Sequence, residues 1–302
     1  MRTRVWRLAF LFIDKKSDTM LVVRIGVLQS WLSERYLPFW EAFLRELGLE
    51  VIRPHREAEV PGLELPAPAR TVVAEVSDLK AQGVDYLLLP DLQLGVDSPR
   101  AEGQSPWLVN LEAALSRFIP GMPPSLVVPA ELNPDLLGLA AEIGQGLTRN
   151  PMVTRRALER TKYLLNPEPP RVRNPSGGRA VGVIAQPYVL TDPESRHRLV
   201  EGLEGVGLTP FFADLPPAKL REEGRQVAEL DLPTHLEAAG MLRYLSRLGR
   251  VGGLVLVADE EYAPLPSVMR KWASKGAKPW RMVGLLEDWP PVFEALAAEL
   301  PA

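Results

Sequence analysis

Three segments of the chain are almost wholly apolar over strand-like lengths, and they constrain the fold more than any other feature. They read VVRIGVL (22–28), YLLLP (86–90) and SLVVP (125–129). A strand with one face in water alternates apolar and polar residues, whereas a strand covered on both faces does not need to. Longer segments with apolar residues at helical spacing separate these runs, such as the one containing Phe39, Trp40, Phe43 and Leu44. The pattern predicts a parallel sheet between layers of helices.

The same pattern stops and then restarts in the second part of the chain. Residues 166–178, NPEPPRVRNPSGG, are rich in turn formers and have no apolar periodicity, which is typical of a linker. New strand-like runs follow, beginning with RAVGVIAQPY (179–188). A length of 302 residues also suits two domains better than one. We therefore expect an α/β protein with two doubly wound, Rossmann-like (flavodoxin-like) domains, whose mainly parallel sheets face a cleft, at 20–165 and 179–302.

Residues 1–19 do not fit either predicted domain. Two arginines precede a short apolar run from Trp6 to Ile13, but no small-residue cleavage site follows. The run is also far shorter than the ~20 apolar residues that a membrane span needs. Met20 lies directly before the first strand-like run. We expect residues 1–19 to be a disordered or mis-called extension, the protein to be cytoplasmic, and no membrane to be involved.

Composition excludes several classes of function. The net charge is -3 and no Lys/Arg-rich run occurs, so nucleic acid is not an expected partner. The chain has no cysteine, which rules out a thiol nucleophile, a disulfide and a cysteine-ligated cluster. The histidines His55, His197 and His235 lack metal-binding spacing. Neither GxGxxG nor GxxxxGK[ST] is present, so no metal and no cofactor are expected.

In open α/β sheets ligands bind beyond the carboxyl ends of the strands, so residues at the predicted strand ends are the best site candidates. Several of them are acidic and could bind a cation or act as acid and base, or they could be solvated loop carboxylates. The candidates are Gln29, Ser30, Pro90, Asp91, Glu131, Gln186, Pro187, Tyr188, Asp259, Glu260, Glu261, Glu287 and Asp288.

Four landmarks occur in an order that resembles a known family. They are YLPFWEAFLRELGLEVI (36–52), VDYLLLPDL (84–92), AQPYVLTDPESRHRLVEGLEGVGLTP (185–210), and LLED followed by PPVFEAL near the end. Together they resemble the family related to 2-hydroxyacyl-CoA dehydratase subunits and to the C-terminal region of acyl-CoA dehydratase activases. The resemblance covers nearly the whole chain from Met20, and it implies the same two-domain scaffold.

The resemblance also implies a chemistry that this chain lacks the residues to perform. Family members use cysteines at strand ends to hold a [4Fe–4S] cluster that takes part in dehydration of an acyl-CoA. The family's Cys-x-Pro-x-Lys element corresponds to TVVAEVSDLKAQG, where Val76 or Ser77 replaces the cysteine, Leu79 replaces the proline and Lys80 is retained. A later cysteine-containing turn corresponds to Asp259–Glu261. Oxygen ligands do not hold such clusters.

Two hypotheses follow from the resemblance. In the first, the chain is a cluster-less paralogue that works as a non-redox binding or accessory subunit, with a cysteine-containing relative or an activase-type subunit as partner. In the second, it is an enzyme that acts on an acyl-CoA or another anionic small molecule in the interdomain cleft, using Lys80, Tyr188, Glu131, Asp259 and Glu260. A filled cleft with an exposed apolar patch favours the first hypothesis. A deep polar pocket, with Lys80 close to Tyr188, favours the second.

Overall fold

The computed structural model describes residues 22–55, 64–92, 105–166, 179–230, 232–258 and 264–301. Three of the expectations above fall outside these ranges. The predicted extension at 1–19, all but the first residue of the predicted linker, and the candidates Asp259–Glu261 lie outside the described residues.

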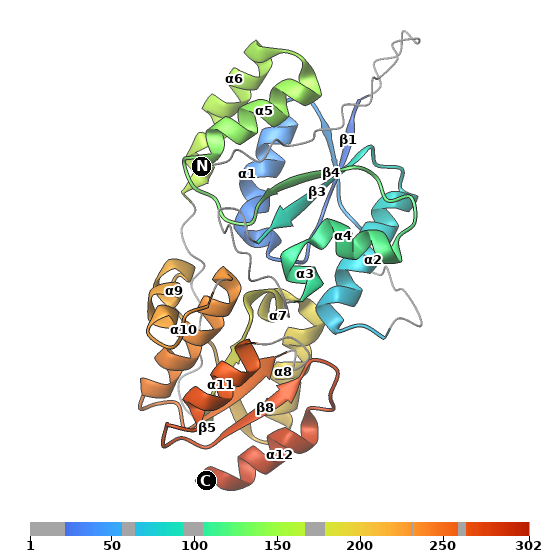
Figure 1. The fold of residues 1–302 in the computed structure, drawn as a ribbon. Coiled ribbons are helices and arrows are strands. Elements are labelled where there is room, and N and C mark those ends of the chain that lie inside the picture. Colours follow the sequence, from blue (N-terminus) through green and yellow to red (C-terminus); the bar gives the residue numbers. More distant parts are fainter. Residues whose placement is uncertain are drawn as a thin grey trace.

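The first half of the chain forms one parallel sheet with helices on both sides (Figure 1). Its strands lie in the order β2-β1-β3-β4, and all three pairings are parallel. In chain order the elements are β1 (Arg24–Val27), α1 (Ser33–Glu46), β2 (Glu50–Ile52), α2 (Ala67–Ala81), β3 (Tyr86–Asp91), α3 (Pro106–Val109), α4 (Leu111–Phe118), β4 (Ser125–Pro129), α5 (Leu136–Thr148), α6 (Pro151–Thr161) and the 3-10 helix η1 (Lys162–Leu165).

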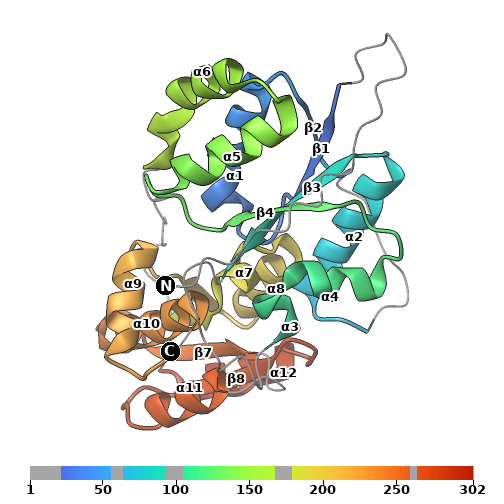
Figure 2. The same ribbon diagram turned by 45° about the horizontal axis from the view of Figure 1, so that its top comes forward.

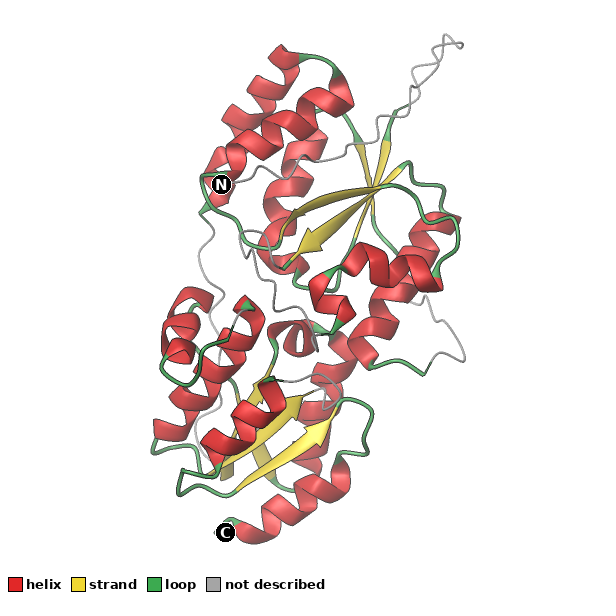
Figure 3. Ribbon diagram, in the orientation of Figure 1, coloured by secondary structure: helices red, strands yellow, loops and turns green. Residues whose placement is uncertain are grey.

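The second half repeats this topology (Figure 3). Its strand order, β6-β5-β7-β8, corresponds strand for strand to that of the first sheet, and its pairings are again parallel. The elements are β5 (Arg179–Ala185), α7 (Pro187–Thr191), α8 (Pro193–Gly205), β6 (Leu208–Phe211), α9 (Pro217–Arg225), α10 (Pro233–Arg247), β7 (Gly253–Ala258), α11 (Leu265–Ala273), β8 (Trp280–Gly284) and α12 (Pro290–Glu299). The prediction of an α/β protein with parallel sheets is confirmed.

Helices cover both faces of each sheet, which explains the unbroken apolar runs. In β3, Leu88 packs with residues of α1 and α5 on one face, while Leu87 and Leu89 pack with residues of α2 and α4 on the other. In β7, Leu254 and Leu256 face α10 and α11, and Val255 faces α8 and α12. Successive side chains of a strand point to opposite faces, so a strand between two helix layers needs apolar residues at every position.

One hydrophobic core extends through both halves of the molecule. The layer formed by α2, α3 and α4 in the first half and the layer formed by α8 and α12 in the second contribute to a single cluster of buried side chains. Trp31, after β1, is at the meeting point, where its ring centroid lies 4.9 Å from that of Tyr188 in α7. The turned view in Figure 2 shows α7 and α8 next to the first half. The two halves therefore share core packing.

One local prediction differs from the structure. The strand-like run at 179–188 ends as a strand at Ala185, since Pro187 begins α7. Residues 106–118 form two helices, because Asn110 has non-helical backbone between them and its side chain accepts a hydrogen bond from Ala113 N–H. Helix α6 packs against α1 and α5.

In the described part of the chain, no helix is both long enough and apolar enough to cross a membrane.

Candidate functional site

The turn after β1 has an unusual backbone that a buried carboxylate holds in place. Trp31 and Leu32 have φ values of 54° and 63°, in the left-handed region that non-glycine residues seldom occupy. Two backbone N–H groups of this turn, from Gln29 and Ser30, donate to Glu75 Oε2 at 3.2 and 3.3 Å, and the Ser30 hydroxyl donates at 2.8 Å. Burial raises the pKa of Glu75, and the hydrogen bonds from Ser30 and Gln29 only partly oppose this. Glu75 of α2 thus fixes the strained turn that leads into α1.

A network of four charged side chains joins the two halves of the chain. We call Arg35, Glu131, Arg221 and Glu237 the ion network. The carboxylate of Glu237, in α10, is fully buried and accepts two hydrogen bonds from the Arg35 guanidinium of α1, at 3.1 and 2.8 Å. Arg221 of α9 donates to Glu237 at 2.9 Å and also pairs with Glu131, which follows β4. The bidentate geometry compensates for burying the Glu237 charge.

Arg35 stays charged despite its burial. Burial alone would lower the pKa of Arg35, but the Glu237 carboxylate that faces it outweighs this effect, so that its pKa lies above the usual value. Arg35 therefore keeps its positive charge at neutral pH.

The ion network forms one wall of a cavity of about 280 Å³, which we call the junction pocket. Its walls come from both halves: α1, the end of β3, the β4–α5 connection and the first turn of α10. Thr234 is 3 % exposed, and its hydroxyl has no hydrogen-bond partner among the described residues. The lining residues are Leu32, Arg35, Asp91, Leu92, Pro129, Ala130, Glu131, Asn133, Asp135, Leu136, Pro233, Thr234 and Glu237.

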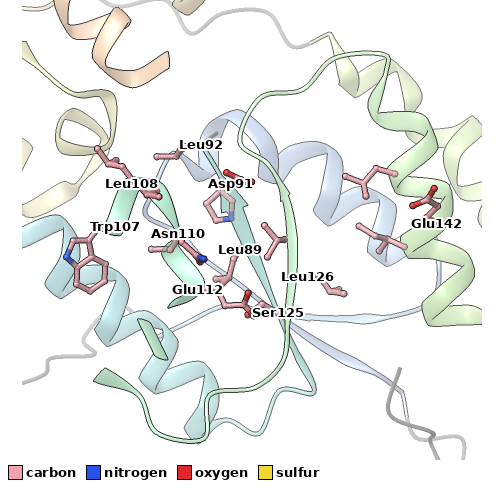
Figure 4. A pocket seen from close by; sticks show the side chains of 16 residues that line it. Leu89, Asp91, Leu92, Trp107, Leu108, Asn110, Glu112, Ser125, Leu126 and Glu142 are labelled. Carbon is pink, nitrogen blue, oxygen red and sulfur yellow. The ribbon is translucent and has the colours of Figure 1, made fainter. Parts of the chain in front are cut away.

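A second cavity, of about 310 Å³, lies at β4, the edge strand of the first sheet, and we call it the edge pocket. Figure 4 shows its labelled side chains, among them Asn110 and Glu112 from the α3–α4 region and Glu142 from α5. Several leucines and Ile143 contribute apolar side chains to its lining. The buried hydroxyl of Ser125 lacks a hydrogen-bond partner among the described residues. Asp91 and Leu92 line both pockets, so the pockets adjoin at the carboxyl end of β3.

Three of the predicted site residues line these pockets. Glu131 and Asp91 line the junction pocket, and Pro90 and Asp91 line the edge pocket. The rule that ligands bind beyond the carboxyl ends of parallel strands located them. Gln29 and Ser30 lie at the predicted strand end as well, but their polar backbone groups bind Glu75.

The predicted residues of the second half that the structure describes, Gln186–Tyr188, Glu287 and Asp288, do not line either pocket. Tyr188 is 5 % exposed and packs on Trp31, as a core aromatic does. Pro187 is buried in the first turn of α7, and the buried side-chain oxygen of Gln186 has no partner among the described residues. Glu287 and Asp288 are exposed after β8, where the Glu287 carboxylate accepts a 2.6 Å hydrogen bond from Gly284 N–H.

Lys80 lies beside the amino ends of the strands and lines neither pocket. It is in the last turn of α2, and its ammonium group donates to the carbonyl oxygen of Pro120, in the segment that leads into β4. A helix between parallel strands runs antiparallel to them, so its last turn lies beside the amino ends of the strands. Tyr188 contacts Trp31 beyond the carboxyl end of β1. The structure therefore does not bring Lys80 and Tyr188 together.

Sequence reasoning missed most of the charged residues at the site. Arg35, Glu75 and Arg221 sit within helices whose sequences give no sign that these side chains point inward. Glu237 offered a signal, because it lies in PTHLEAAGMLRYL among apolar residues that make a helix buried on nearly all sides. Thr234 lies in the first turn of α10, which begins at Pro233 and has no side-chain cap.

The described residues include many carboxylates, but these are not grouped as metal ligands. Among them no cluster of three or more His, Asp or Glu side chains is placed to hold a metal ion. The fold and the site thus define a parallel α/β protein of two similar sheets, with a polar pocket lined from both halves. Searches of family models, curated proteins and solved structures found no match for this chain.

Proposed function

We propose that this protein is a non-redox binding protein that holds a small molecule in the junction pocket, where its two halves meet. In this proposal the halves are flavodoxin-like domains facing a cleft, on the scaffold of the 2-hydroxyacyl-CoA dehydratase-related family. The observation that carries the proposal is a polar cavity lined from both halves, whose lining includes Thr234, a residue with a buried hydroxyl that has no hydrogen-bond partner among the described residues. Buried polar groups are nearly always paired, so an unpaired one in a cavity wall fits a ligand position.

The proposal favours binding over catalysis because the predicted catalytic residues are dispersed. A general acid or base must lie within hydrogen-bonding reach of the reacting group. Lys80 donates to Pro120 at the amino edge of the sheet, whereas Tyr188 is buried against Trp31. Glu131 lines the pocket but pairs with Arg221. A polar pocket was expected to favour the enzyme hypothesis, yet without assembled acid and base groups it supports recognition.

The accessory-subunit form of the hypothesis has less support. Large contiguous patches of exposed apolar surface mark sites of protein interaction. The large apolar side chains that are exposed among the described residues lie on different elements: Val22, Phe118, Met152, Tyr163 and Leu286. A cysteine-containing relative or an activase-type partner therefore rests on the resemblance alone.

Ligand binding can be tested with the full-length chain and a panel of cationic, anionic and neutral metabolites. We expect at least one compound to raise the melting temperature and to bind with 1:1 stoichiometry in isothermal titration calorimetry. Thr234→Val should weaken that binding several-fold, because it removes the hydroxyl and keeps the shape. Thr209→Val, in β6 and outside both pockets, is the matched control. A panel without any binder, or equal binding by Thr234→Val, would refute the proposal.

The non-redox part can be tested separately. After anaerobic reconstitution with iron and sulfide, the absence of cysteine leads us to expect no stoichiometric cluster in absorption or electron paramagnetic resonance spectra. A stoichiometric iron–sulfur cluster on the purified chain would refute the proposal that the protein is non-redox.

A further inference from the structure

The two pockets carry a strong excess of negative charge. Only one basic side chain, Arg35, lines them in the described part of the chain, and Arg221 approaches as a member of the ion network. Among the described residues six carboxylates and these two guanidinium groups lie at the pockets, so acidic side chains outnumber basic ones there. The six are Asp91, Glu112, Glu131, Asp135, Glu142 and Glu237. Such a field repels a phosphate-bearing or carboxylate ligand and concentrates cations.

The two arginines are already paired with carboxylates. The Arg35 guanidinium donates to Glu237 from both terminal nitrogens, and Arg221 contacts both Glu131 and Glu237. An anionic ligand would have to compete with these carboxylates for the two guanidinium groups. The acyl-CoA expected from the family resemblance therefore does not suit this site.

Two buried hydroxyls supply independent evidence of polar ligand groups. Thr234 lines the junction pocket and is 97 % buried, and Ser125 lines the edge pocket. Both hydroxyl oxygens are buried without a hydrogen-bond partner among the described residues. A hydroxyl oxygen accepts hydrogen bonds from an ammonium group, which carries three donors and no acceptor.

The lining of the pockets alternates between apolar and acidic surface. Leu89, Leu126 and Ile143 form apolar wall in the edge pocket, with Glu112 and Glu142 beside them. Leu32 and Leu136 do the same in the junction pocket, and Asp91 is common to both pockets. Apolar surface suits methylene groups, and carboxylates suit ammonium groups. A divalent metal ion suits the site less well, because no three acidic or histidine side chains converge in the described residues.

From these contacts we infer that the ligand of the proposed binding function is an aliphatic diamine or polyamine, which lies along the adjoining pockets with its methylene chain on the leucines and its ammonium groups at the carboxylates. The inference rests on the proposed function and specifies its ligand class.

The experiment is isothermal titration calorimetry of the full-length chain with spermidine, putrescine, butylamine and coenzyme A at low ionic strength. We expect spermidine and putrescine to bind with 1:1 stoichiometry, butylamine to bind at least tenfold more weakly because it has one ammonium group, and coenzyme A not to bind. Replacing both Glu112 and Glu142 by Gln should weaken spermidine binding about tenfold. Both side chains are exposed, so the double variant should fold normally.

Glu294→Gln is the matched control, since Glu294 is an exposed carboxylate of α12 that lines neither pocket. An equal loss of affinity in this control would show that spermidine binds the acidic surface at large, and would overturn the inference. If coenzyme A or another anion binds and Thr234→Val weakens it, the proposed function stands and the polyamine inference fails. If no compound of either charge binds, both fail.

Discussion

Glu237 is a fully buried carboxylate whose charge is neutralised by two guanidinium groups from different helices. Removing it by Glu237→Ala leaves the partly buried Arg35 and Arg221 with only Glu131 as a carboxylate partner in the ion network. Because breaking a buried ion pair by removing one partner costs about 3–5 kcal/mol, we expect the free energy of unfolding to fall by that amount. Urea unfolding followed by circular dichroism measures it. Glu201→Ala, at an exposed pair with His197, should change stability by less than about 1 kcal/mol. Similar losses in both variants would contradict the buried network.

His235 should make stability depend on pH in a defined window. Burial lowers the pKa of this histidine from 6.5 to about 4, and its Nδ1 has no hydrogen-bond partner in the described part of the chain. Between these two values the unfolded state binds the proton and the folded state does not. The free energy of unfolding therefore falls as pH decreases through this window, by about 2 kcal/mol from about pH 7 to about pH 5.

Urea unfolding at several pH values, compared with His235→Leu, tests this expectation. The variant cannot titrate at this position, so its free energy of unfolding should fall by about 2 kcal/mol less than that of the wild type from about pH 7 to about pH 5. His197→Gln, which alters an exposed histidine, should keep the slope of the wild type. If His235→Leu also kept the wild-type slope, the buried histidine would not be the cause of the pH dependence.

At the scale of single residues, the sequence located Asp91 and Glu131 but missed Arg35, Arg221 and Glu237. The difference is physical. Residues after a strand are placed by sheet topology, which apolar patterning reveals. A charged residue within a helix is placed by how that helix rotates against its neighbours. Arg35 meets Glu237 only because the halves associate, and no local pattern encodes a contact across about two hundred positions.

Two glycines set the contact between α9 and α10, which positions Arg221 beside Glu237. A side-chain carbon on Gly240 would overlap the backbone carbonyl of Leu220, and one on Gly224 would overlap that of Leu236. These reciprocal contacts let the two helix backbones touch. Packing on α10 also stabilises α9, because short helices draw most of their stability from tertiary contacts.

Gly240→Ala should therefore push the helices apart and lower the free energy of unfolding by about 2 kcal/mol or more. It should also weaken ligand binding, since Arg221 moves relative to the junction pocket. Gly138→Ala in α5 is the matched control, because open space surrounds that position and alanine is the better helix former by about 1 kcal/mol. Thermal and urea unfolding compare the two variants. A stable Gly240→Ala protein with unchanged affinity would disprove the close helix contact.

At the scale of elements, both four-stranded sheets could be predicted because two-sided burial leaves unbroken apolar runs in the sequence. The short segments were harder to predict. Asn110 divides α3 from α4 by capping the second helix, and Pro187 turns the end of a predicted strand into α7. Asparagine and proline each have several local roles, and tertiary contacts select one of them.

At the scale of the whole molecule, the shared core predicts that the two halves unfold together. Buried side chains of both halves form one cluster, with the Trp31 ring packed against that of Tyr188 where they meet. We expect a single calorimetric transition, with equal van't Hoff and calorimetric enthalpies. Amide hydrogens in β1 and β7 should lose protection at the same denaturant concentration, as hydrogen exchange with mass spectrometry can measure.

Trp31→Ala tests whether this contact couples the halves. It removes a ring that is 1 % exposed, at an expected loss of about 3–5 kcal/mol, and it should separate the transitions of β1 and β7. Phe293→Ala removes a fully buried ring of the same cluster, but Phe293 packs on Trp289 and Gly202 within the second half. This variant should lower stability and keep one transition. Two transitions in the wild type would mean that the halves fold independently and that the junction pocket lies between separately stable units. A single transition in Trp31→Ala would mean that contacts other than this one couple the halves.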